Sequence, residues 1–406
     1  MNLKRWLQIA FLNLTIVAAI GVILRYKIAF SFPFVDQKHL LHGHSHFAFS
    51  GWVSQALMAL VISRLSSARQ TDLFKRYNWI LWGNLICAYG MLVSFPLQGY
   101  GLFSITFSTC SLLISYCFAA YLWSDIKRCE HKKVCFSWFN AGALFNALSS
   151  LGAFALAYMM ATKNLHQNWY LAAVYFFLHF QYNGWFMFAI LGLLFERIED
   201  AAVLPATLRS IFRLFVFACV PAYFLSALWM PMPRIVYIVV VLSAVTQLVG
   251  WILTISIIRS KQKIFKQQLH SAPYLIIGLS LVALTIKLLL QLGSTIPSLS
   301  TLTFGFRPIV IGYLHLVLLG VISLFILGYS MSIGILAESS RSKTGITIFI
   351  SGIILNEIAL MIQGAMAIGY VAVPYINETL LAIAIVMFLG VFMLNQRATK
   401  RIESDI

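Results

Sequence analysis

Residues 308–336 read PIVIGYLHLVLLGVISLFILGYSMSIGIL, a stretch with one histidine and no Asp, Glu, Lys or Arg. A helix needs roughly 20 apolar residues to cross the hydrocarbon core of a bilayer, so this stretch predicts a membrane-spanning helix. The whole chain of 406 residues has the same character, with 61% hydrophobic and 10% charged residues. Soluble domains carry about 25% charged residues. We therefore expect an all-α, polytopic membrane protein embedded in a lipid bilayer.

Apolar stretches of similar length recur along the chain and predict twelve transmembrane helices. No long hydrophilic segment separates them, so residues 1–406 are expected to form a single transmembrane domain. The predicted spans are 5–25, 42–64, 78–97, 102–124, 137–161, 168–195, 211–231, 234–258, 272–292, 308–336, 345–369 and 379–396.

The basic residues indicate the orientation of these spans. With the N-terminus inside, 22 of the 29 Lys and Arg residues fall in inside segments and 6 in outside segments. Cytoplasmic loops of membrane proteins carry such an excess, so both termini are predicted to be cytoplasmic, and a bacterial inner membrane is the expected location. The net charge of +17 lies in short connectors rather than on one face of a soluble domain, which argues against nucleic acid as a partner.

Three histidine-containing segments share a pattern. Residues 46–52 read HFAFSGW, residues 179–185 read HFQYNGW and residues 315–321 read HLVLLGV, each with a glycine five positions after the histidine. The histidines are 133 and 136 residues apart, close to a third of the chain, and each lies on the second of four predicted spans. Equal spacing of similar units indicates internal repeats. We predict three pseudo-repeated four-helix arcs, roughly 1–133, 134–267 and 268–406.

Ionisable side chains inside a bilayer are costly and mark candidate functional sites. All three histidine helices run from outside to inside in this topology, so the histidines could line one site in the outer half of the membrane. Neutral imidazole is a ligand for transition metals and haem iron. His42 and His46, four residues apart on one helix face, could alternatively hold a metal together with His39. The glycines could give room for a flat macrocycle or could simply permit close helix packing.

On these residues the chain resembles subunit I of the haem-copper oxidases, and it is also similar to NnrS-like haem- and copper-containing membrane proteins. The resemblance implies a low-spin haem between the second and tenth helices, held by His315 and by His46 or His44, with His42 left as a metal-ligand candidate. It implies a further metal ligand, for copper, at His179. The seventh helix lacks the family's two adjacent copper-ligating histidines, and Tyr313 stands where the high-spin haem ligand is expected.

The sequence therefore predicts an oxidase-type scaffold that keeps the low-spin haem and has lost or rebuilt the reactive centre. We expect electron transfer or chemistry on NO or O₂, with electrons supplied by a membrane or periplasmic electron donor. No catalytic residue is assigned. Lys287 and Glu357 are the other charges within spans and could belong to a proton path. Two alternatives are a histidine-lined transporter without haem, and a non-catalytic protein of haem or copper assembly or sensing.

Overall fold

The structure is a computed structural model that describes residues 1–131, 133–164, 166–300 and 306–402, with the backbone alone for 396–402. Throughout these ranges the regular structure is helical, without strands. Ten of the helices are long and apolar enough to cross a membrane, and an eleventh span results if the bent pair Pro205–Cys219 and Pro221–Ala227 is counted as one. The all-α prediction is confirmed, and the ten apolar helices indicate an integral membrane protein.

The predicted span 168–195 lies in a helical stretch but is not among these ten. It consists of α7 (Gln167–His179), the π-helical turn η2 (Phe180–Phe186) and α8 (Met187–Asp200). Its middle carries the polar side chains of His179, Gln181 and Asn183, all buried, which lower its apolarity. The count of twelve spans and the orientation of the termini stay predictions.

The chain divides into two compact units. The first unit comprises residues 1–118 and 326–406, and the second unit comprises residues 119–325. The prediction of a single transmembrane domain with three pseudo-repeats is not decided by this division.

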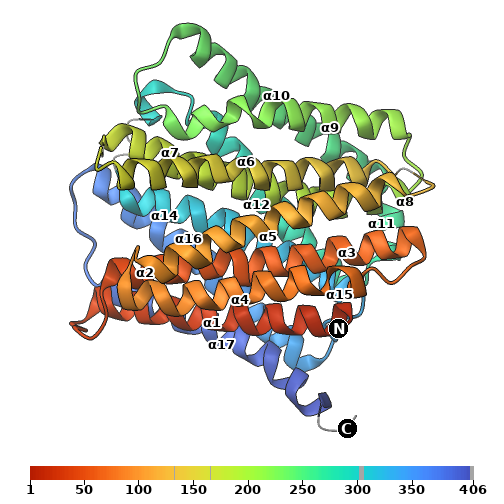
Figure 1. The fold of residues 1–406 in the computed structure, drawn as a ribbon, viewed down its shortest axis with the longest axis horizontal. Helices are drawn as coiled ribbons and strands as arrows, with labels where there is room; N and C mark the ends of the chain where they lie inside the picture. The colour runs from red at the N-terminus through yellow and green to blue at the C-terminus, as the bar shows by residue number, and fades with distance from the viewer. Residues whose placement is uncertain (132, 165, 301–305, 403–406) are drawn as a thin grey trace. The chain divides into compact units, whose positions relative to one another are not determined.

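In the first unit one long helical stretch occupies the centre. It is built from α2 (Gln37–Phe47), the π-helical turn η1 (Ala48–Ser54) and α3 (Gln55–Arg69), and 83% of its most apolar window is buried. Helices α1 and α4 pack against it, and α16, α17 and α1 pack in sequence, as the red, orange and blue ribbons of Figure 1 show. The other helices here are α1 (Leu3–Ala29), α4 (Phe74–Gln98), α5 (Leu102–Lys127, to residue 118), α15 (Leu324–Ser332, from residue 326), α16 (Ser340–Ile368) and α17 (Ile376–Ile402).

In the second unit, α6 (Cys135–Ala161) packs along the whole of the α7–η2–α8 stretch. Helix α10 contacts both α9 and α12, and α12 in turn packs on the π-helical turn η4. The remaining elements are α9 (Pro205–Cys219), the 3₁₀ turn η3 (Pro221–Ala227), α10 (Arg234–Ser260), α11 (Gln262–Gln268), α12 (Ser271–Gly293), α14 (Arg307–His315) and η4 (Leu316–Ser323).

Large apolar side chains are exposed in the middle of several spans, which suits contact with lipid. Ile86 and Val93 on α4 are each 59% exposed, and Ile252 on α10 and Val282 on α12 are 55% and 56% exposed. Large exposed apolar surfaces are rare on soluble monomers and mark membrane or protein contacts. The exposed side chains therefore support the assignment of the bilayer as the surrounding medium.

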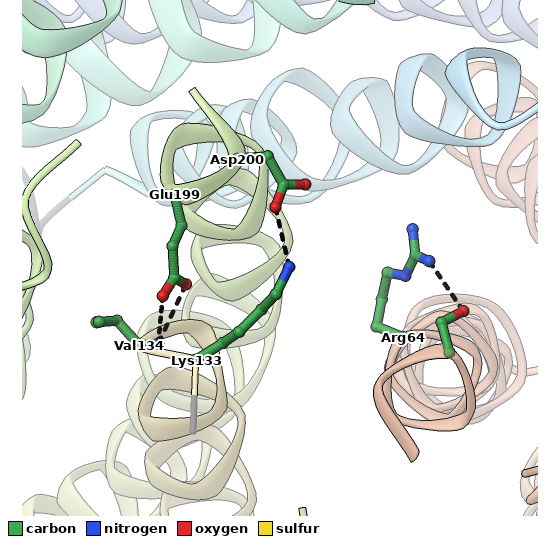
Figure 2. Close-up of polar contacts among 6 residues, drawn as sticks. Arg64, Lys133, Val134, Glu199 and Asp200 are labelled. Carbon is green, nitrogen blue, oxygen red and sulfur yellow. Dashed lines mark hydrogen bonds and ion pairs between the residues drawn. The ribbon is translucent and has the colours of Figure 1, made fainter. Parts of the chain in front are cut away.

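At one end of the second unit, acidic groups of α8 hold the start of α6. The Glu199 carboxylate accepts the backbone N–H of Val134 at 3.2 and 3.1 Å, and Lys133 Nζ forms an ion pair with Asp200 at 2.9 Å (Figure 2). Desolvation lowers the pKa of Lys133, but the hydrogen bond and charge of Asp200 outweigh it and raise the pKa above its usual value. These contacts join the two ends of the α6–α7–α8 hairpin.

Replacing Glu199 with alanine should lower the free energy of unfolding by about 1 kcal/mol, because a helix N-terminus loses the acceptor of an otherwise unpaired N–H group. Glu199→Gln keeps one oxygen acceptor and should lose less. Asp200→Asn removes an exposed ion pair and should cost under about 1 kcal/mol. Thermal unfolding in detergent checks the order of the three variants, and a loss in Asp200→Asn larger than in Glu199→Ala would contradict it.

Candidate functional site

The first histidine group lies at the start of the central helix of the first unit. The Asp36 side chain caps α2 by accepting the backbone N–H of His39 at 2.8 Å, and this hydrogen bond lowers the pKa of the carboxyl. The His39 ring packs against Gly99, where a Cβ would lie 2.4 Å from Nε2. Gly99 also has a φ of +62°, so both its backbone and the histidine require a residue without a side chain.

His42 and His46 share the face of α2 that meets the end of α4. The His46 ring stacks on Phe95 with centroids 4.5 Å apart and an interplanar angle of 14°. The His42 ring lies 5.9 Å from Phe95 and 4.8 Å from Tyr100. Within the described residues neither imidazole is hydrogen-bonded by the protein, and Nε2 of His42 is shielded from solvent. A shielded polar atom without a partner is costly, so His42 is suited to an exogenous ligand, and His46 lies on the same face of α2.

His44 lies on a different face of the same helix. Its ring carbon Cε1 lies 3.5 Å from the place where a Cβ on Gly21 of α1 would be. The sequence left open which of three histidines serves as a ligand. The structure separates His44, which faces α1, from His42 and His46, which face α4.

His179, on α7 of the second unit, is fully buried and has both ring nitrogens in use. Nε2–H donates to the carbonyl of Cys219 at 2.9 Å, and Nδ1 accepts the side-chain amide of Asn183 at 3.1 Å. The predicted role of His179 as a metal ligand stays a prediction, and a metal would have to displace Asn183 or Cys219 from the ring. These two partners come from the next turn and from another helix, and they were not predicted from the sequence.

His315, the last residue of α14, is partly buried, and one of its ring nitrogens is hydrogen-bonded within its own helix. Nδ1–H donates to the carbonyl of Ile311 at 2.8 Å, one turn earlier in the same helix. Because a carbonyl oxygen can only accept, Nδ1 of His315 carries a proton in this arrangement. Histidines that ligate metals commonly donate their other N–H to a carbonyl in this way, so the geometry fits an axial ligand.

A π-helical turn begins within two residues of each of the three repeated histidines. The turns η1, η2 and η4 follow His46, His179 and His315, and the sequence motifs did not predict them. Single π-helical turns in α-helices often occur at functional sites. Side chains of neighbouring helices donate to carbonyls of all three turns, namely Asn13 to Gly51 at 2.6 Å, Asn84 to Ser50 at 3.0 Å, Cys219 to Asn183 at 3.8 Å and Ser280 to Val321 at 2.6 Å.

Replacing Asn84 with alanine should destabilise the first unit by about 1–3 kcal/mol, since the buried Ser50 carbonyl and the Gln55 side chain would both lose a donor. A matched control is Asn140→Ala, because Asn140 is a partly buried asparagine of α6 for which no side-chain hydrogen bond is seen among the described residues. Thermal unfolding in detergent measures the difference. Equal stability of the two variants would contradict the assigned role of Asn84.

The glycines five positions after the histidines are packed rather than open. A Cβ on Gly51 would lie 2.7 Å from the Phe47 ring, and one on Gly184 would lie 2.6 Å from Cβ of Phe145. At Gly320 the nearest atom is Cβ of Ala283 at 3.3 Å. Of the two interpretations of these glycines, close packing therefore agrees with the structure, and space for a macrocycle at these positions does not.

The two charged residues that were predicted within spans for a proton path belong to different units. Lys287 of α12 is 2% exposed and lies within electrostatic range of His179 and Cys219. Glu357 of α16 is partly buried and accepts the side-chain amide of Asn356 at 3.3 Å. A proton path that uses both residues stays a prediction.

No protein family and no curated protein sequence matches this chain. Within the described residues there is also no group of three or more His, Cys, Asp or Glu side chains placed to hold a metal ion. The resemblance to haem-copper oxidases consequently depends on the histidine segments themselves.

Proposed function

We propose that this chain is a haem-binding integral membrane protein in which His46 would hold the haem iron, while His315 stays the second ligand that the sequence predicts. The observation that carries the proposal is the His46 imidazole: it lies inside an apolar span, stacks on Phe95, and makes no hydrogen bond with the described residues. A porphyrin provides four of the ligands of its iron, so the protein needs to supply only one or two imidazoles. His42, on the same face, is the alternative ligand of this helix.

The protein side of such a site has defined tasks. Phe95 holds the His46 ring by stacking, and the Ile311 carbonyl accepts a hydrogen bond from Nδ1 of His315. When bound, haem supplies one-electron redox chemistry and affinity for diatomic gases such as NO or O₂. The proposed activity is electron transfer or chemistry on such gases within the membrane. A membrane or periplasmic protein would donate the electrons, and the proposed location is a bacterial inner membrane.

A reduced-minus-oxidised visible spectrum of the purified protein, made in cells supplied with haem, tests this proposal. Sharp low-spin bands at about one haem per chain are the expected result. Metal analysis of the same sample then reports whether copper accompanies the iron, as a ligand role for His179 would require. A colourless protein without iron would overturn the haem proposal.

A specific observation also favours one alternative, a transporter without haem. Lys287 is buried within electrostatic range of His179 in the second unit, and ionisable residues inside membrane proteins often belong to substrate or ion pathways. This alternative predicts no haem, and transport that is lost in Lys287→Met. A protein of haem or copper assembly or sensing would instead show bound cofactor without turnover.

A further inference from the structure

In the first unit, α4 and the part of α5 up to residue 118 pack against each other as an antiparallel hairpin. A Cβ on Gly83 of α4 would lie 2.7 Å from Cδ1 of Ile114 on α5, and a Cβ on Gly90 would lie 2.4 Å from the Phe107 ring. Seven residues forward along α4 therefore correspond to seven residues back along α5. The two contacts fix the register of the hairpin.

Two free cysteines lie between these contacts, one on each helix. Cys87 is four residues after Gly83, and Cys110 is four residues before Ile114, so the register places the two thiols opposite each other. The Cys87 thiol interacts electrostatically with Cys110, which agrees with this placement. Neither thiol makes a hydrogen bond with the described residues. The two sulfur atoms are therefore each other's natural reaction partners.

The surroundings of this cysteine pair are apolar and border on lipid. Both helices are long and apolar enough to cross a membrane. Cys87 is buried and Cys110 is partly buried, while the nearby side chains of Ile86 and Leu113 are largely exposed. Apolar surroundings disfavour the thiolate, which is the form that attacks water-borne oxidants. A reaction in which a neutral thiol gives up a hydrogen atom suits this place better.

We propose that Cys87 and Cys110 form a disulfide when lipid peroxyl radicals reach them from the bilayer. Each of two radicals breaks one S–H bond, takes the hydrogen atom and becomes a lipid hydroperoxide. The two thiyl radicals that remain combine to form the S–S bond. Each thiol is thus oxidised by one electron and each peroxyl radical is reduced by one electron.

The product suits the hairpin in two ways. A disulfide is neutral, so the apolar surroundings do not oppose it. It also requires that the two backbones lie close together, and residues without side chains at Gly83 and Gly90 permit such an approach. The proposal goes beyond the haem site and uses none of its residues. Its test can therefore fail while the haem proposal holds, and the reverse is also true.

The experiment places the full chain in vesicles of polyunsaturated phosphatidylcholine with a lipid-soluble azo initiator, which generates peroxyl radicals in the presence of oxygen. The protein is then unfolded, alkylated, digested and analysed by mass spectrometry. It should lose two of its six alkylatable thiols and yield a peptide pair joined through Cys87 and Cys110. Cys110→Ser should lack this peptide pair.

The matched control is Cys117→Ser. Cys117 is also partly buried on α5, two turns after Cys110, and the register places Ile80 rather than a cysteine opposite it. This variant should form the joined peptides as fully as the intact protein.

Three results would overturn the proposal. The first is oxidation of the vesicle lipid without joined Cys87 and Cys110 peptides from the intact protein. The second is equal joining in saturated vesicles treated with aqueous hydrogen peroxide, which would mean that the thiols react from the water side. The third is equal loss of the joined peptides in Cys117→Ser and Cys110→Ser. If Cys110→Ser does not fold, Cys87→Ser takes its place, and the peptides from the intact protein still identify the joined residues.

Discussion

Replacing His315 with alanine should remove most of the haem from the purified protein. Bis-histidine ligation depends on both imidazoles. The hydrogen bond from Nδ1 to the Ile311 carbonyl holds the His315 ring in place on α14. The haem-to-protein ratio should fall at least about tenfold, which corresponds to the loss of roughly 1.4 kcal/mol or more of binding free energy. The residual haem should lose its sharp low-spin bands. Pyridine haemochrome quantification and the visible spectrum of the same sample measure both effects.

The histidines of α2 provide the comparison for this result. His46→Ala should lose haem to the same extent as His315→Ala, whereas His44→Ala should retain it, because the His44 ring faces Gly21 of α1 rather than the α4 side. Loss of haem in His42→Ala with retention in His46→Ala would move the ligand one turn toward the start of the helix. Unchanged haem content and spectrum in His315→Ala would remove His315 from the site.

The helical, membrane-embedded character of the chain could be predicted from sequence because it depends on composition over long windows. Ten predicted spans agree with helices of sufficient length and apolarity, and the bent α9–η3 pair supplies an eleventh candidate. Composition alone does not decide whether the stretch around His179 crosses the membrane. Its polar side chains satisfy one another inside the second unit, where Gln181 donates to both Asn146 and Ser149, and a hydropathy window counts only their polarity.

The histidine positions were visible in the sequence, but their different surroundings were not. The repeated motif gives His46, His179 and His315 the same local context, yet one ring stacks on Phe95, one is enclosed by two hydrogen bonds and one is anchored to its own helix. Those partners lie on other helices or depend on the register of the helix. The π-helical turns that follow each histidine likewise depend on donors from neighbouring helices, such as Asn13 and Ser280.

His179 should prove to be a structural residue whose loss destabilises the second unit. In His179→Ala the buried carbonyl of Cys219 and the amide of Asn183 would both lose their partner, and a cavity would replace the ring. Lost hydrogen bonds and a cavity together should cost about 3–5 kcal/mol. The apparent melting temperature in detergent should therefore fall clearly in this variant.

A matched control is His166→Ala, because the exposed His166 precedes α7 and its side chain does not cap that helix. Its melting temperature should equal that of the intact protein. The metal-ligand prediction for His179 gives a different outcome, since loss of a ligand would lower the copper or iron content while a folded protein remained. A His179→Ala variant with unchanged melting temperature and reduced metal content would contradict the structural role. A lowered melting temperature in Asn183→Ala would support that role, because the Asn183 side-chain amide contacts the His179 ring at Nδ1.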